Sequence, residues 1–255
     1  NVTRPTNTTS YSLRFNGKTI PGDITLTLNG ALNQIQTGGL LITPKMGTFD
    51  AVIGGAGQLY TGNAQQMPEF LINQYNPSGS LVIKNEIIDR PEEINVSGAT
   101  LHSTDSRRIN GVSAALVATL PLGTVVSGVG IPAGAKITGY YNSTDIQIDL
   151  SHTMSGAAVS PTFTFHSGIE KLGPGPLVLD NDNTYTGITF LANGVLTATS
   201  LADGGLPSSI GASTNAAANL VFNGGTLRYV GDSVSTNRSF TVSDSARFEV
   251  AHELA

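Results

Sequence analysis

Few residues in this chain are grouped in a way that would support chemistry. The four histidines, His102, His152, His166 and His252, lie far apart in the sequence. None belongs to an H-x-x-x-H pair, the spacing that places two imidazoles on one metal ion. Ordinary surface or loop positions explain them better, so we predict no metal ligand among the histidines.

A run of oxygen-bearing side chains is the best alternative for a metal site. It reads DNDN and consists of Asp180, Asn181, Asp182 and Asn183. Carboxylate and amide oxygens are the ligands that calcium prefers, but this run lacks the glycine and the distal glutamate of a calcium loop. Asp and Asn are also common turn formers, and a turn is the interpretation we favour.

Acidic side chains could serve a glycosidase, which needs two carboxylates facing each other across a sugar. The adjacent Glu92 and Glu93 point to opposite sides of an extended chain, and Asp203 stands apart from them. No G-x-S-x-G motif marks a nucleophilic serine. The aromatic residues are spread singly, which favours stacking in a core over a sugar platform. We therefore predict no catalytic residue, no cofactor site and no enzyme.

Composition and charge exclude further classes of function. The chain has 255 residues, a formal net charge of -5 and no cysteine, so it contains no disulfide. Nucleic-acid binding needs many cationic contacts, and the pair Arg107 and Arg108 is better explained as a solvated loop. No apolar run approaches the ~20 residues of a membrane-spanning helix. We predict neither a nucleic-acid partner nor a membrane span in this segment.

The elements that must position these side chains are short strands separated by glycine and asparagine. Residues 168–196 alternate apolar with small polar residues, and the unit Asn-Gly followed by an apolar residue recurs at residues 29–32, 193–196 and 223–227. An antiparallel meander should show regular spacing and two-residue loops, whereas the spacing here is uneven. A solenoid accepts uneven loops because each coil contacts only its neighbours. We predict an all-β, right-handed parallel β-helix.

Residues 168–196 also resemble a known family. The segments GIEKLGPGPLVL, NTYTGIT and NGVL are similar to the autotransporter-associated β-strand repeat, with Asp182 and Ile188 as departures. Residues 210–240 look like the segment that often follows this repeat, and parts of residues 12–83 look like the coils before it. The resemblance implies a β-helical passenger of a bacterial surface or secreted protein, normally without enzymatic activity.

A different pattern interrupts this arrangement. Residues 122–137 read LGTVVSGVGIPAGAKI and resemble a small β module found in phage virion and bacterial surface proteins. Further strands are expected at residues 144–150 and 162–165. We predict solenoid coils at residues 1–98, an inserted β module at 99–167 and further coils at 168–255, with the module leaving from one corner of a coil.

These expectations lead to one function and two alternatives. The N-terminal residues show no signal pattern and the last residues read as a strand, so we expect a slice of a longer protein. The favoured function is a structural or adhesive scaffold at the bacterial outer-membrane surface or outside the cell. Its partners would be further repeats of the parent chain, or host or matrix glycans and proteins. The alternatives are end-to-end assembly of neighbouring copies into extracellular filaments, and a carbohydrate-binding or carbohydrate-cleaving β-helix of the phage tailspike or polysaccharide lyase type.

Overall fold

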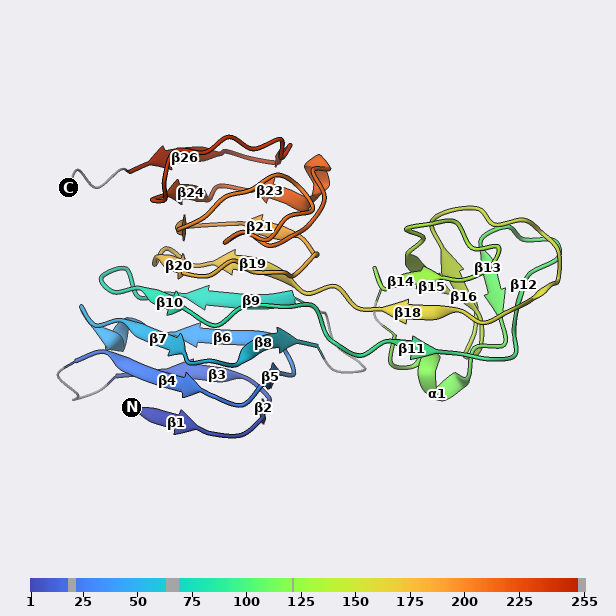
Figure 1. Ribbon diagram of the computed structural model, residues 1–255, viewed down its shortest axis with the longest axis horizontal. Coiled ribbons are helices and arrows are strands. Elements are labelled where there is room, and N and C mark those ends of the chain that lie inside the picture. The colour runs from blue at the N-terminus through green and yellow to red at the C-terminus, as the bar shows by residue number, and fades with distance from the viewer. Residues whose placement is uncertain (18–21, 63–68, 121, 252–255) are drawn as a thin grey trace. The chain divides into compact units, whose positions relative to one another are not determined.

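The protein folds into two compact units. The computed structural model describes residues 1–17, 22–62, 69–120 and 122–251 (Figure 1). One unit, here called the solenoid unit, comprises Asn1–Thr61, Glu69–Asp89 and the residues from Ser167 onward. The other, the inserted unit, comprises Gly62–Pro68 and Arg90–His166. Each unit has its own hydrophobic core.

The solenoid unit is built from coils that repeat the same order of strands. The first coil contains β1 (Val2–Arg4), β2 (Thr8–Ser10) and β3 (Leu13–Phe15); the second contains β4 (Ile24–Leu28), β5 (Leu32–Ile35) and β6 (Gly39–Ile42); the third contains β7 (Ala51–Gly54), β8 (Gln58–Thr61) and β9 (Glu69–Gln74). A short 3-10 helix, η1 (Pro44–Met46), lies between the second and third coils. Every strand pairs in parallel with the equivalent strand of the next coil.

The later coils extend two of these three faces. Their strands are β10 (Leu81–Ile83), β19 (Gly168–Leu172), β20 (Leu177–Leu179), β21 (Thr189–Leu191), β22 (Val195–Ala198), β23 (Leu220–Phe222), β24 (Thr226–Tyr229), β25 (Thr241–Val242) and β26 (Arg247–Val250), with η2 (Ala217–Asn219) before β23. Sheet A, as we name it, is eight-stranded with the order β1-β4-β7-β10-β20-β22-β24-β26, and sheet C is seven-stranded with the order β25-β23-β21-β19-β9-β6-β3. Sheet B is the three-stranded sheet β2-β5-β8. The predicted parallel β-solenoid is confirmed, and its right-handedness stays a prediction.

Because the parallel strands pair in register, residues at equivalent positions of successive coils stack into columns in the solenoid unit. One column of sheet A runs through Val2, Leu26, Ile53, Ile83, Leu179, Ala198, Tyr229 and Val250. The interior residues expected from the sequence are all buried: Leu177, Leu179, Leu196, Leu220, Phe222 and Leu227. Each such side chain contributes roughly 1.5 to 3 kcal/mol by burial. The coils are therefore held together by apolar columns as well as by backbone ladders.

The Asn-Gly corners work in two different ways. Gly194 and Gly224 have φ angles of 69° and 100°, the left-handed region that glycine tolerates best. Gly30 has no positive φ; instead, a Cβ there would lie 2.2 Å from the backbone nitrogen of Asn7 in the preceding coil. Close approach of two coils, and not backbone conformation, therefore explains the glycine at position 30.

The inserted unit is antiparallel. One sheet has the order β11 (Ile94–Asn95), β18 (Thr162–Thr164), β14 (Val125–Ser127), and the other has the order β15 (Ile137–Tyr140), β16 (Ile146–Ile148), β13 (Arg108–Asn110), β12 (Ala99–Leu101), β17 (Ala158–Val159). One short helix, α1 (Ala114–Val117), begins after Ser113, whose hydroxyl accepts a hydrogen bond from the Leu116 N–H. The strands expected at residues 144–150 and 162–165 appear as β16 and β18. Residues 94–95, expected among the solenoid coils, pair here with β18.

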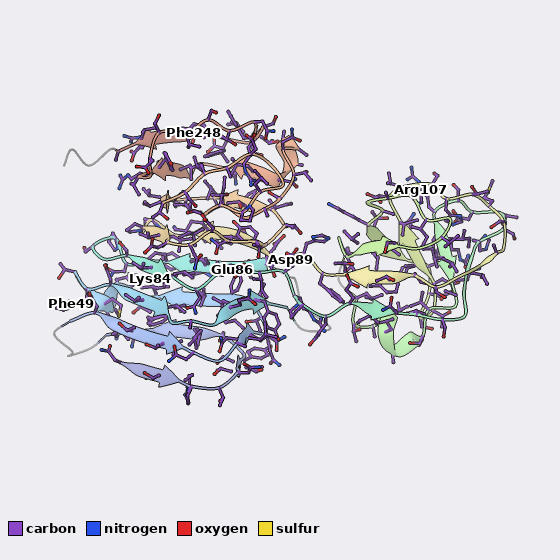
Figure 2. The ribbon with its side chains drawn as sticks, viewed as in Figure 1. Phe49, Lys84, Glu86, Asp89, Arg107 and Phe248 are labelled. Atoms are coloured by element: carbon purple, nitrogen blue, oxygen red, sulfur yellow. The ribbon has the colours of Figure 1, made fainter. Side chains whose placement is uncertain are left out.

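Asp89 closes the solenoid unit where the chain leaves it (Figure 2). Its Oδ1 accepts hydrogen bonds from the backbone N–H of Ser167 at 2.7 Å and of Thr186 at 2.9 Å, and its Oδ2 accepts one from the Thr186 hydroxyl. Because the last solenoid residue before the inserted unit is bonded to the first one after it, a short linker can join them. We propose that the two units fold independently, with boundaries at 89/90 and 166/167 in place of the expected 98/99 and 167/168.

Deleting the inserted unit tests this proposal. A variant with residues 90–166 replaced by a short glycine linker is expected to keep a cooperative unfolding transition of the solenoid unit. Its midpoint should lie within about 5 °C of the midpoint of the same unit in the unsubstituted chain. The physical reason is that β9 and β10 pair directly with β19 and β20, so no ladder of the solenoid passes through the deleted residues. The measurement is thermal unfolding by circular dichroism. The same deletion carrying Asp89→Ala is the control and should melt lower; an unfolded deletion variant would refute independent folding.

Candidate functional site

The structure does not bring the histidines together. His152 is buried, and its ring nitrogens lie 2.7 Å from the Arg108 carbonyl and 2.9 Å from the Thr153 carbonyl. Nδ1 of His102 accepts a hydrogen bond from the Thr104 N–H at 3.2 Å. His166 is half-buried, and His252 lies outside the described residues. Within residues 1–17, 22–62, 69–120 and 122–251, no group of three or more His, Cys, Asp or Glu side chains converges.

The DNDN run forms a corner between coils, and each side chain has a partner. Asp180 lies 3.7 Å from the Lys84 ammonium, and Asn181 donates to the Lys84 carbonyl at 2.8 Å. Asp182 accepts a hydrogen bond from the Ser200 hydroxyl. Asn183 is buried, accepts from the Ile87 N–H at 2.7 Å and donates to the Ser209 carbonyl at 2.8 Å. These bonds join successive coils, in keeping with a turn.

The acidic residues singled out in the sequence lie apart. Glu92 accepts a hydrogen bond from Nε of Arg90 at 2.7 Å, and Glu93 is exposed. Asp203 lies in the solenoid unit, where its Oδ1 accepts a hydrogen bond from the Asn237 N–H at 2.7 Å. Arg108 is bound to Asp145 with Nε 3.2 Å from Oδ2. None of these contacts assembles a pair of carboxylates.

Sequence reasoning missed an acid pair on the outer face of sheet C. The register places Glu69 of β9 opposite Gly168 and Leu71 opposite Glu170 of β19, so the two glutamates are diagonal neighbours on the same face. Burial raises the pKa of the Glu69 carboxyl, and the negative charge of Glu170 raises it further. Only the period-2 pattern of the two strands hints at this pair, because the inserted unit separates the two glutamates in the sequence.

This pair has one chemical capability. A carboxyl group whose pKa is raised keeps its proton to a higher pH and can donate it to a bound group, with a second carboxyl group beside it. That division of labour is the one glycoside hydrolysis uses. The pair occupies the outer face of a parallel sheet, next to the half-exposed Phe190, which pairs with Glu170. It is the arrangement in the solenoid unit that most resembles a catalytic site.

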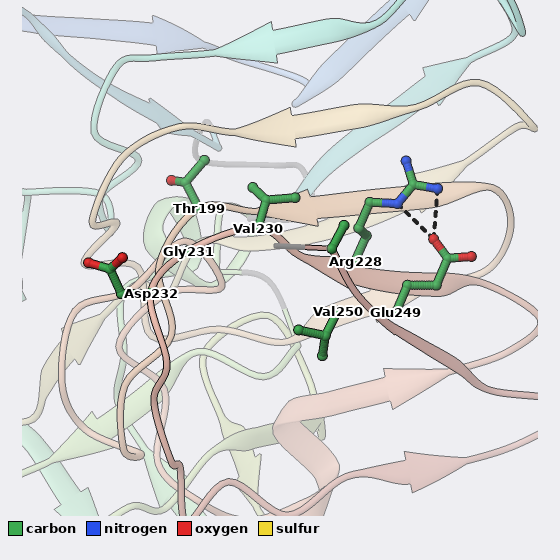
Figure 3. Close-up of a pocket in the computed structure, with 8 residues that line it drawn as sticks. Thr199, Arg228, Val230, Gly231, Asp232, Glu249 and Val250 are labelled. Atoms are coloured by element: carbon green, nitrogen blue, oxygen red, sulfur yellow. Dashed lines mark hydrogen bonds and ion pairs between the residues drawn. The ribbon is translucent and has the colours of Figure 1, made fainter. Parts of the chain in front are cut away.

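An open depression lies at sheet A in the last coils (Figure 3). It has a volume of about 990 Å³ and is lined by Thr199, Arg228, Val230, Gly231, Asp232, Glu249, Val250 and Ala251. Both Nε and the terminal nitrogen of Arg228 lie 2.7 Å from Oε2 of Glu249, while Arg247 lies 2.9 Å from Oε1. Glu249 is thus neutralised by two arginines, which leaves the depression suited to weak polar contacts.

The aromatic residues are only partly in the core. Phe70, Phe163 and Tyr185 are fully buried, as stacking in a core predicts. In the last coils, Phe222 is buried under Phe240 and Phe248, with ring centroids 5.8 Å and 4.7 Å away. Those two outer rings are about half exposed. The end of the described solenoid therefore presents an apolar surface.

Comparison with known proteins finds a protein that is similar to this chain in sequence. No family model and no solved structure matches the chain, so the assignment of a repeat to residues 168–196 stays a prediction. None of the helices in the described residues is long and apolar enough to cross a membrane. The chain is 30% identical over 208 residues to the adhesin BmaC autotransporter of Brucella suis biovar 1 (strain 1330). That match covers 81% of this chain and 5% of the relative, so by sequence the chain is similar to one short segment of an autotransporter adhesin.

Proposed function

We propose that the chain is a non-enzymatic structural and adhesive segment of a large bacterial passenger protein, displayed at the outer-membrane surface or secreted. The observation that carries this proposal is the similarity to an autotransporter adhesin over 81% of the chain. The fold supports it, because stacked coils with local contacts make an extended scaffold that tolerates a bulky insertion. Its partners are further coils of the parent chain, and glycans or proteins of a host or matrix.

An adhesion assay tests this function. Beads coated with the purified chain are expected to attach to cultured animal cells or matrix, and soluble chain should compete the attachment away. Beads coated with an unrelated acidic protein of similar pI are the matched control. Attachment that soluble chain does not reduce would contradict an adhesive role.

The acid pair favours a second candidate, a carbohydrate-cleaving β-helix. If Glu69 donates a proton with Glu170 beside it, the chain should cleave a polysaccharide, and Glu69→Gln should abolish turnover while leaving the fold intact. Under the adhesive proposal, a broad panel of bacterial and plant polysaccharides shows no turnover. Turnover that disappears in Glu69→Gln would replace the adhesive proposal with this one.

Filament assembly is a related structural candidate. The last coils expose Phe240, Phe248 and Val250, the last of these to 81%, and β26 is the edge strand of sheet A at this end. Unpaired edges and exposed apolar residues can recruit another chain. Rods that lengthen with protein concentration in electron micrographs would support filaments, and a monodisperse particle would oppose them.

A further inference from the structure

The five-stranded sheet of the inserted unit has a polar outer face. Leu101, Ile109 and Ile146 point into the core and are buried. Their neighbours along the strands point outward, and the register sets Arg108 of β13 opposite Gln147 of β16. Tyr141 follows β15 directly, and its N–H donates to the Asp145 carbonyl at 3.0 Å, which extends the pairing of β15 with β16. The Tyr141 ring therefore follows the strand that lies next to Gln147, which itself pairs with Arg108.

Charged neighbours hold this ring in place. The Tyr141 hydroxyl donates to Oδ2 of Asp105 at 2.6 Å, and the Arg108 guanidinium lies 4.8 Å from the ring centroid. The hydrogen bond lowers the pKa of Asp105 and raises the pKa of Tyr141. Despite both contacts, Tyr141 remains 42% exposed.

Arg108 is itself held in position by the buried carboxylate of Asp145. Asp145 is only 6% exposed, and its Oδ2 accepts hydrogen bonds from Arg108 Nε at 3.2 Å and from Asn142 Nδ2 at 2.8 Å. Its Oδ1 accepts from the Gly111 N–H at 3.2 Å. The side chain of Arg108 is still 27% exposed, so part of its donor capacity faces solvent. The ring and the guanidinium are thus ordered before any ligand arrives, which reduces the entropy lost on binding.

Two other exposed tyrosines, Tyr140 and Tyr75, differ from Tyr141. Tyr140 is equally exposed, but its hydroxyl donates to the Leu120 carbonyl, a backbone contact. Tyr75, in the solenoid unit, is 48% exposed, and its side chain makes no hydrogen bond or ring contact with the described residues. Exposure alone therefore does not distinguish Tyr141; its frame of charged side chains does.

We propose that Tyr141, Arg108 and Gln147 form a carbohydrate-binding site on the inserted unit. A pyranose ring would lie with its C–H face against the exposed part of the Tyr141 ring, because tyrosine offers an apolar face together with a polar edge. Its hydroxyl groups would accept hydrogen bonds from Arg108 and exchange them with the Gln147 amide. One aromatic ring gives weak binding, which a surface protein strengthens by displaying many copies. This site deepens the proposed adhesive function and rests on it.

The test is direct binding of defined sugars to the whole 255-residue chain. The probes are cellohexaose, chitohexaose and a heparin hexasaccharide, measured by titration calorimetry. We expect at least one probe to bind, and Tyr141→Ala to weaken it at least tenfold. Tyr141→Phe, which keeps the ring and loses the bond to Asp105, should weaken it less. Tyr75→Ala is the matched control and should leave binding unchanged.

Two results would overturn the site. One is equal binding by Tyr141→Ala and the unsubstituted chain, with thermal unfolding showing that both are folded; the other is no binding of any probe. Either result leaves the adhesive proposal standing if coated beads still attach to cells and soluble chain still competes. If beads coated with the unsubstituted chain do not attach to cells while the chain still binds a sugar, the adhesive function is refuted and the sugar-binding site stands.

Discussion

Replacing Leu196 with aspartate is expected to unfold the later coils of the solenoid unit. Leu196 has no exposed surface and stands between Leu177 and Leu227 in one column of sheet A. The substitution loses roughly 1.5 to 3 kcal/mol of apolar burial. It also forces a carboxylate into an apolar interior without a partner, at a cost of several kcal/mol more. The sum is comparable to the 5–15 kcal/mol that stabilises a typical domain.

Urea unfolding followed by far-ultraviolet circular dichroism measures this effect. Asp182→Asn is the matched control, a change at the corner two strands away along the same chain. Asp182 accepts a hydrogen bond from the Ser200 hydroxyl, and the amide oxygen of asparagine can accept the same bond. The control should therefore unfold within about 0.5 kcal/mol of the original chain. A Leu196→Asp variant as stable as this control would show that the column is not what holds the coils together.

The solenoid was predictable because its physical signals are local. Leu177 and Leu179 sit two apart in a strand bounded by glycine and asparagine, and that pattern alone indicates which side chains face inward. Parallel stacking then follows from short strands with uneven loops. Gly30 shows the limit of such reasoning, since its need for close approach to Asn7 depends on a neighbouring coil.

The candidate sites were not predictable, because they join residues that are distant in the sequence. Glu69 and Glu170 meet only because β9 pairs with β19 across the inserted unit. Tyr141 becomes distinct from Tyr140 only when Arg108 and Asp105 come beside it. For Lys171 a signal existed, since period 2 places it on the same face as the buried Ile169. A lysine inside an apolar column nonetheless contradicts the usual rule for charged residues.

Replacing Lys171 with methionine is expected to destabilise the solenoid unit by about 3 kcal/mol at pH 10.5, where the folded lysine is uncharged and its burial carries no charge-desolvation penalty. Lys171 is fully buried and follows Leu13, Leu40 and Ile72 in a column of sheet C. Its ammonium donates to the carbonyls of Leu172, Gly173 and Asn193 at 3.0, 2.7 and 3.1 Å. These carbonyls belong to the corners of two successive coils, so the lysine ties one corner to the next. Methionine fills the column but leaves three buried acceptors without this donor, and urea unfolding of both proteins measures the loss.

The same lysine should make stability depend on pH with a defined sign. Burial lowers the pKa of Lys171 to about 8, against its ordinary value of 10.5 in an unfolded chain. Between these values the unfolded chain holds the proton and the folded chain has released it, so the free energy of unfolding rises with pH. The original chain should therefore gain about 3 kcal/mol relative to Lys171→Met between pH 7 and pH 10.5. Subtracting the variant at each pH removes the contribution of other titrating groups. A difference that stays constant over this range would mean that the three carbonyls hold the ammonium as well as water does, and that the coil corners bind a charge without penalty.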